Sequence, residues 1–341
     1  MGSGPLGVRL SSSHLRKVGW GPRLLTSGTF ASALRGRRSK VPSRPTIDPG
    51  LGSPLTYNRA QSQVLDVGEC IYCGAKPPVS LTREHVFPDG LAGGIILRNA
   101  SCEPCRKVTH EFETASLTGP LLSIRAKHNL RYGKNRGKPE SIRVRIGRDE
   151  PPKFKDVLIR EYPNLIPMPS LPKPGYLDLR PRGLPGIVSG RGVVLNLDEV
   201  KRLCVKFSTD SISFDLKENN RAFIRMLAKI AHGLAWAIYG GDSFRPFLRE
   251  TILGTEVDVG YYVGIETRDK QISPFDRPML HRYNHRIWLW THNIIVFQIT
   301  LFEYLSSPTY TVVVGEFTPT ADCLSKHRLV RDGGSYRSVL D

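Results

Sequence analysis

Three short motifs, CIYC at residues 70–73, LTREHVFP at 81–88 and CEPC at 102–105, determine how this part of the chain is expected to fold. A tetrahedral zinc ion held by four thiolates needs two tight turns that each present two sulfurs, and paired C-x-x-C motifs supply them. The spacing therefore predicts a structural zinc site. Its ligands are Cys70, Cys73, Cys102 and Cys105. Such a site needs no histidine, so the Glu84-His85 dipeptide between the motifs requires another explanation.

The residues between the two motifs are expected to form a small unit that the metal stabilises. The intervening 28 residues make a long loop for the zinc ion to close, and binding could contribute about 10 kcal/mol or more to folding. Residues 81–86 predict a strand, the glycines at 90, 93 and 94 predict turns, and residues 95–97 predict a return strand. The second motif then begins a helix over about 103–117. The expected unit is strand, strand, helix.

These motifs together resemble the HNH endonucleases, whose catalytic core is a ββα-metal finger, and in particular the members with two C-x-x-C knuckles and an E-H-V-x-P strand. The resemblance covers 45 to 50 residues. It implies that His85 is the general base that deprotonates water for attack on a phosphodiester, a role that suits the pKa of histidine. It implies that Glu84 binds a catalytic divalent cation such as Mg²⁺. Asn99 falls where the family often has its central asparagine. Because adjacent strand residues point to opposite faces, a strand end or a bulge must bring Glu84 and His85 to one site.

One position departs from the family pattern. The family usually has Asn or His directly after the last cysteine as a second ligand for the catalytic metal, whereas this chain has Arg106, which has no lone pair to donate. His110 lies one helical turn further on and is either that ligand or an ordinary exposed histidine. Alternatively Arg106 and Lys107, with Arg83, hold the scissile phosphate. A further alternative is that catalysis has been lost and only binding remains.

The charge of the chain predicts a polyanionic partner. The formal net charge is +18, from 49 Lys and Arg against 31 Asp and Glu. Nucleic acid or an anionic membrane surface would fit this balance. No apolar run is long enough to span a bilayer, and we expect nucleic acid, with DNA first, and no membrane as the partner. The leading hypothesis is a metal-dependent HNH-type endonuclease. The alternative is a non-catalytic zinc-stabilised nucleic-acid-binding protein. The oligomeric state is left open.

The first acidic residue is Asp48, so the N-terminal segment is basic and rich in Ser and Gly. We expect residues 1–60 to be a disordered basic arm outside the fold. We also expect the protein to be cytoplasmic, because thiolate ligation of zinc requires a reducing compartment. An organelle-targeting segment is the alternative interpretation.

The predicted fold class is α+β: a zinc-stapled HNH-like module at residues 65–118, then a larger α+β region at 119–341 with antiparallel strands and one long amphipathic helix. A strand with one cationic face is predicted at 141–146, and the Pro-rich residues 151–185 predict an extended connection along a surface. The helix is predicted at 219–239, ended by Gly240, with Lys229 and His232 at its polar face or edge. Further strands are predicted at 257–265, 286–290, 294–304 and 310–317, the last two as a hairpin.

Overall fold

In the computed structural model, the cysteine motifs lie in a three-stranded sheet covered by a helix, a unit that we call the cysteine module (residues 63–118). The structure describes residues 6–11, 63–91, 94–130, 137, 139–182, 191–194, 196–216, 219–265, 279–281, 285–291, 293–302, 305, 307–318, 329–332 and 335–338. Only the backbone is described for residues 6–11, 63, 191–194, 215–216, 279–281, 285–291, 329–332 and 335–338.

The cysteine module has the predicted order of strand, strand and helix. β3 (Leu81–His85) pairs antiparallel with β4 (Ile95–Cys102), which runs directly into α1 (Glu103–Thr118). A short 3-10 helix, η2 (Asp89–Leu91), lies between the strands. One strand was not predicted: β2 (Gln63–Asp66) adds to the other edge of β4 in parallel, giving the order β2-β4-β3.

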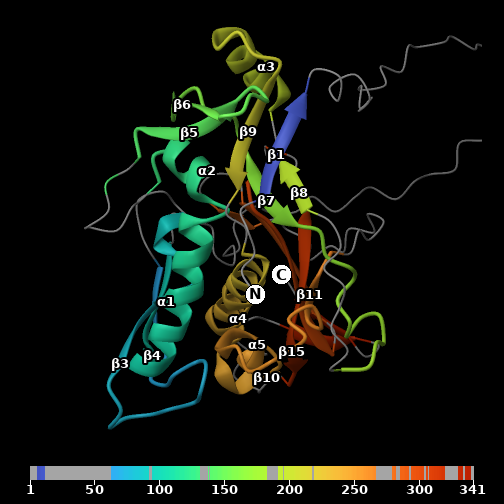
Figure 1. Cartoon of the computed structure of the whole chain (residues 1–341). Helices are drawn as coiled ribbons and strands as arrows, with labels where there is room; N and C mark the ends of the chain where they lie inside the picture. The colour runs from blue at the N-terminus through green and yellow to red at the C-terminus, as the bar shows by residue number, and fades with distance from the viewer. Residues whose placement is uncertain are drawn as a thin grey trace, which may run out of the picture.

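A second sheet lies above the cysteine module in Figure 1. Its strand order is β1-β9-β5-β6, and all its pairs are antiparallel. The elements of this part are β1 (Leu6–Ser11), α2 (Leu122–Lys127), β5 (Ser141–Ile146), β6 (Lys153–Leu158), β7 (Ile166–Pro169), β8 (Arg191–Val194), α3 (Leu197–Lys206) and β9 (Ser211–Leu216). A small separate core, which includes Val144, Phe214 and Leu203, holds α3 against this sheet.

The C-terminal region forms a third sheet, with the order β10-β15-β14-β13-β12 and with β11 also paired to β15. Its elements are α4 (Asn220–Tyr239), η3 (Gly241–Ser243), β10 (Phe244–Pro246), α5 (Arg249–Leu253), β11 (Val263–Gly264), β12 (Met279–His281), β13 (His285–Thr291), β14 (Ile294–Thr300) and β15 (Thr309–Phe317). β16 (Leu329–Asp332) and β17 (Ser335–Ser338) form a hairpin of their own. The fold class is therefore mixed α+β with antiparallel sheets, as predicted.

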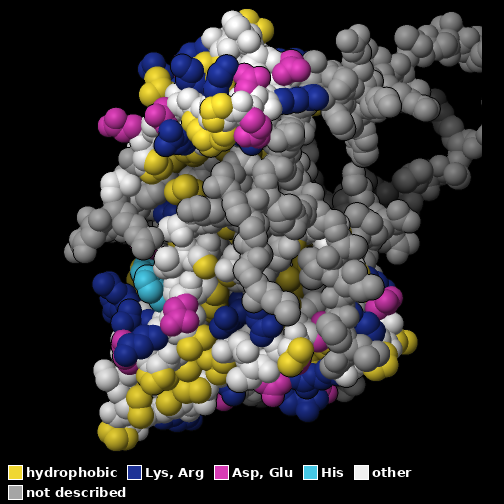
Figure 2. All heavy atoms as spheres, in the orientation of Figure 1, with side chains coloured by type: hydrophobic (Ala, Val, Ile, Leu, Met, Phe, Trp, Pro, Cys, Tyr) yellow, Lys and Arg dark blue, Asp and Glu magenta, His cyan; other side chains and the backbone are white. Residues whose placement is uncertain are grey.

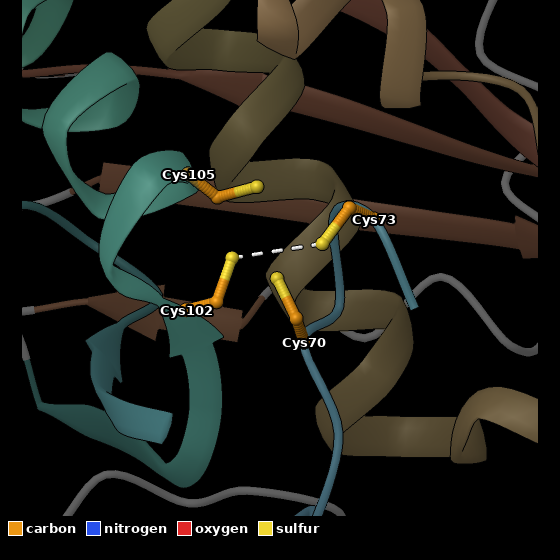
Figure 3. Close-up of side chains that lie close together, drawn as sticks. All are labelled: Cys70, Cys73, Cys102 and Cys105. Atoms are coloured by element: carbon orange, nitrogen blue, oxygen red, sulfur yellow. Dashed lines mark hydrogen bonds between the residues drawn. The ribbon is translucent and has the colours of Figure 1, made fainter. Parts of the chain in front are cut away.

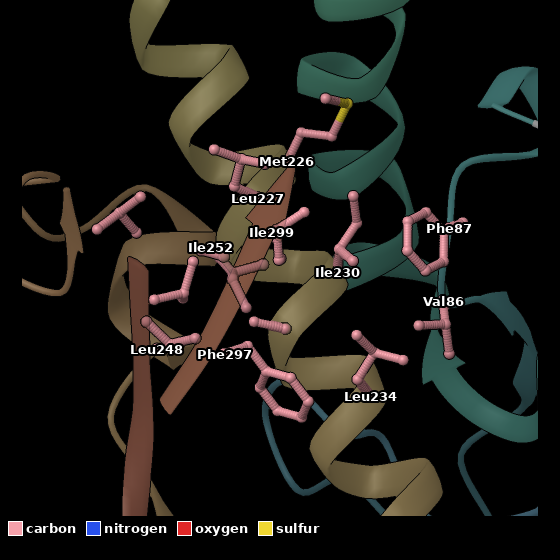
Figure 4. Close-up of a cluster of buried hydrophobic side chains, with 14 of the residues drawn as sticks. Val86, Phe87, Met226, Leu227, Ile230, Leu234, Leu248, Ile252, Phe297 and Ile299 are labelled. Atoms are coloured by element: carbon pink, nitrogen blue, oxygen red, sulfur yellow. The ribbon is translucent and has the colours of Figure 1, made fainter. Parts of the chain in front are cut away.

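Helix α4 joins the cysteine module to the C-terminal sheet. The Asn219 side chain caps it by accepting a hydrogen bond from the Ala222 N–H at 2.9 Å, and Gly240, with φ +73°, ends it. In Figure 4, Ile230 and Leu234 of α4 lie between Val86 and Phe87 of the cysteine module on one side and Phe297 of β14 on the other. One hydrophobic core thus runs from the cysteine module through α4 to the sheet.

The prediction for the polar residues of α4 was wrong. Lys229 and His232 are both fully buried, rather than at a polar face or edge. The reason is that α4 packs against α1 on one side and against β14 and β15 on another, so that most of its circumference is covered. Each of these side chains therefore needs a hydrogen-bonding partner inside the protein.

Several strand boundaries also differ from the prediction. In the predicted strand 257–265 only β11 is extended, because the Asp258 and Gly260 region forms a turn in which the Gly260 N–H donates to Asp258 Oδ1. β14 ends at Thr300, because Phe302 adopts a left-handed φ of +54°. The predicted hairpin is present as the antiparallel pair β14–β15.

The predictions for the Pro-rich connection and for the N-terminal arm also need correction. Residues 151–182 are non-helical as expected, but β7 within them is buried rather than laid along a surface, and Tyr310 Oη donates to Pro169 O. We expected residues 1–60 to lie outside the fold, whereas the backbone of β1 pairs with β9. The remaining residues of that arm lie outside the described part of the chain. No described helix combines the length and apolar character that crossing a bilayer requires.

Candidate functional site

The two C-x-x-C motifs form the paired knuckles that the sequence predicts. In the first, the Gly74 N–H donates to Cys70 O and the Cys70 N–H donates to Ala75 O, both at 2.8 Å. Gly74 has φ +76°, a conformation that glycine adopts without strain. In the second, Cys102 is the N-cap of α1 and Cys105 lies in its first turn. The Ile71 N–H donates to Ala100 O at 2.9 Å, which fixes the first knuckle against β4.

The four sulfurs converge on one point, so the cluster could hold a metal ion such as zinc. Figure 3 shows the side chains pointing toward one another from the 70–73 loop and the start of α1. All four Sγ atoms lie within 4.8 Å of one another, and those of Cys73 and Cys102 are 3.6 Å apart. Tetrahedral zinc with Zn–S bonds of about 2.3 Å places sulfurs about 3.8 Å apart. Burial and the neighbouring Cys70 raise the pKa of the Cys105 thiol, so a thiolate at Cys105 needs a cation to stabilise it.

Glu84 and His85 occupy the C-terminal end of β3 and differ in exposure. The Glu84 side chain is buried, whereas His85 is only partly buried. The β3–β4 ladder is irregular between Thr82 and Glu84, and β3 ends at His85. The irregularity precedes the dipeptide, whereas Glu84 and His85 pair in regular register with Leu97 and Ile96, so only the strand end at His85 is available to bring the two side chains to one site.

Glu84 belongs to a buried ion-pair cluster that the sequence did not predict, which we call the lysine–carboxylate cluster (Glu84, Glu113 and Lys229). Lys229 Nζ lies 2.7 Å from Glu84 Oε1 and 2.7 Å from Glu113 Oε1. It also donates to the main-chain carbonyl of His85. The exposed fractions of the side chains are 1% for Lys229, 7% for Glu84 and 18% for Glu113. The three elements β3, α1 and α4 each supply one member.

Electrostatics keeps Lys229 charged and His85 neutral. Burial lowers the pKa of Lys229, but Glu113 and Glu84 outweigh burial, so that its pKa is raised above the usual value. Burial raises the pKa of the Glu113 carboxyl, and Lys229 opposes this effect. For His85, burial is the largest cause of a lowered pKa, and Lys229 also lowers it. A neutral imidazole at neutral pH can accept a proton, which a general base must do.

Helix α4 also contacts the first cysteine knuckle. His232 Nε2 lies 2.8 Å from Ile71 O, and because a carbonyl only accepts, Nε2 carries the proton. The imidazole stacks on Tyr72 with ring centroids 5.8 Å apart. Burial lowers the pKa of His232 to about 4. Lys229 and His232, one turn apart, therefore bind α4 to the end of β3 and to the knuckle.

The remaining predicted site residues lie on the surface of the cysteine module. Asn99 is exposed, has φ +49° and donates to Asp66 Oδ1 at 3.0 Å, so it stabilises the β2–β4 edge. Arg106 forms a two-point ion pair with Glu103, each bond 2.7 Å long. His110 is exposed, with Nε2 3.5 Å from Thr114 Oγ1. Arg83 and Lys107 are exposed. Figure 2 shows Lys and Arg side chains beside an exposed histidine over α1.

The catalytic divalent cation that the family resemblance implies does not fit these residues. Its expected first ligand, Glu84, is ion-paired with a buried ammonium. Arg106 stands at the position of the usual second ligand and is cationic. A divalent ion at Glu84 would have to displace Lys229 from the Glu84 carboxylate.

Sequence reasoning missed Glu113 and misplaced Lys229 and His232. The available signal was the apolar character of α4 on nearly every face, which includes Phe223, Ile224, Leu227, Ala228 and Ile230. A helix of that kind is buried, and its polar residues must pair inside the protein. Comparison with family models, with curated proteins and with solved structures found no match to this chain.

Proposed function

We propose that the protein is an HNH-type nuclease, a hydrolase that cleaves phosphodiester bonds of nucleic acid, with DNA as the expected substrate. The observation that carries the proposal is the position of His85: a partly exposed imidazole with a lowered pKa at the end of β3, in the same small sheet as β4, which leads into the second cysteine knuckle. The motifs that resemble the HNH family support the same assignment. Zinc bound by the four cysteines would hold β3, β4 and α1 in place.

In this proposal His85 accepts the proton of the attacking water. The partly buried ring favours the neutral form that this step needs. Lys229 is a positioning residue, because its ammonium donates to the His85 carbonyl and fixes the backbone that carries the imidazole. The exposed cations Arg83, Arg106 and Lys107 hold the phosphate backbone.

Cleavage of supercoiled plasmid and of labelled single-stranded DNA and RNA tests the proposal. The zinc-loaded protein is assayed with and without added Mg²⁺ or Mn²⁺. His85→Ala is expected to abolish cleavage while zinc content and unfolding midpoint stay unchanged. His128→Ala, which removes a histidine outside the cysteine module, is the matched control and should keep full activity. Full activity of His85→Ala would refute the assignment of the base.

A second function is favoured by one specific observation: the Glu84 carboxylate is ion-paired with Lys229. A zinc-stabilised nucleic-acid-binding protein without catalysis uses the same basic surface and needs no free carboxylate. Binding whose affinity falls steeply with salt, with no cleavage of any substrate in the same samples, would favour this second function.

A further inference from the structure

The ammonium of Lys229 has the surroundings of a bound cation. Its Nζ lies 2.7 Å from Glu84 Oε1 and 2.7 Å from Glu113 Oε1, it donates to the His85 carbonyl, and Val86 O lies 3.5 Å away. Two carboxylates and main-chain carbonyls are the oxygen donors that hard divalent cations prefer. The side chains of Lys229 and Glu84 are almost completely shielded from water, so an unpaired charge on either would be strongly destabilising.

The source of this cation is the C-terminal region, not the cysteine module. Glu84 lies on β3 and Glu113 on α1, both inside the cysteine module, whereas Lys229 enters from α4. The packing of Gly233 against Val86 shows how closely α4 approaches: a Cβ added at Gly233 would lie 3.2 Å from a Val86 methyl carbon. Residues beyond the cysteine module thus complete its charge balance.

We infer that Lys229 is the resident cation of the Glu84–Glu113 pocket and takes the place of a divalent metal ion there. Glu84 and Glu113 are then ligands of an ammonium supplied by the chain itself, and the protein takes no Mg²⁺ or Mn²⁺ at this point. The inference rests on the proposed HNH-type function only for the expectation of a metal beside Glu84. Its test reads cation binding and not cleavage, so the two can fail separately.

The test measures Mn²⁺ binding to the full zinc-loaded chain. Binding is monitored as the loss of the free-ion signal in electron paramagnetic resonance, and the zinc content of every sample is measured. The wild-type protein is expected to bind no Mn²⁺ at a stoichiometric level. Lys229→Met keeps an unbranched side chain of similar length and removes the ammonium. It is expected to bind about one Mn²⁺ per chain and to regain thermal stability when Mn²⁺ is added.

Two further variants locate the bound ion. Glu84→Gln combined with Lys229→Met removes one carboxylate and should bind no Mn²⁺. Lys201→Met, which removes an exposed lysine of α3, is the matched control and should behave like the wild type.

Stoichiometric Mn²⁺ binding by the wild type that Glu84→Gln abolishes would overturn the inference, because Glu84 would then be free to bind metal. A folded, zinc-loaded Lys229→Met that ignores Mn²⁺ would also overturn it. Should Lys229→Met fail to fold with or without Mn²⁺, the wild type and Glu84→Gln decide the question by themselves.

Discussion

Protonation of His232 is expected to unfold the junction between α4 and the first cysteine knuckle. The imidazole is fully buried, its Nε2–H donates to Ile71 O, and Nδ1 has no hydrogen-bond partner among the described residues. A proton on Nδ1 would therefore add a buried charge and a donor without an acceptor. This geometry explains why the pKa of His232 is lowered from 6.5 to about 4.

The sign and size of the effect follow from this shift. Between about pH 6.5 and pH 4 the unfolded chain binds the His232 proton and the folded chain does not, so stability falls as the pH falls through that window. A shift of about 2.5 units at 1.36 kcal/mol per unit gives a loss of about 3 kcal/mol in the free energy of unfolding by pH 4. Above about pH 7 His232 contributes no pH dependence.

Urea unfolding of the wild type and of His232→Gln, from pH 8 to pH 4, measures this loss. Glutamine keeps an N–H donor for Ile71 O and does not titrate in this range. Any effect of acid on the cysteine cluster is common to both proteins, so the difference between the two curves isolates His232. The wild type should lose about 3 kcal/mol more than the variant across the window. Parallel curves would refute the proposed burial of the neutral imidazole.

Three other predictions concern lysines and arginines. Lys229→Met is expected to lower the free energy of unfolding by about 3–5 kcal/mol in urea, because it leaves two buried carboxylates without their counterion, and adding Glu84→Gln should restore part of the loss. An equal loss in both proteins would contradict the ion-pair assignment. Arg125→Met should cost about 1–3 kcal/mol, because Arg125 is buried and donates to Gly90 O and Leu117 O. Lys107→Met should leave stability unchanged and lower the slope of log affinity against log salt for DNA by about 0.9. A stable Arg125→Met variant with a lowered salt slope, together with a destabilised Lys107→Met variant with an unchanged slope, would show that the basic surface has been assigned wrongly.

The parts of the fold that the sequence could predict are those set by local rules. Two tight turns with two cysteines each can present four sulfurs to one tetrahedral metal ion. The sulfurs of Cys70 and Cys105 accordingly converge, although the two residues are far apart in the sequence. The boundaries of α4 follow from the Asn219 cap and the Gly240 terminator. The β14–β15 hairpin follows from two apolar runs around a turn.

The parts that could not be predicted depend on tertiary packing. Nothing local in the sequence pairs Lys229 with Glu113, because the contact exists only once α4 lies against α1. Parallel pairing of β2 with β4 likewise has no short-range signal. Burial is likewise not visible in the sequence: Arg125 is buried, and Lys127 is ion-paired with Glu199 at 2.6 Å.

The measurement that tests this account most directly is the metal content of the purified full-length chain, determined by native mass spectrometry beside thiol titration. We expect one zinc ion per chain, four protected thiols, and loss of both zinc and folded structure in Cys102→Ser and Cys105→Ser. A chain that folds without metal, or whose zinc survives the replacement of Cys102, would contradict it.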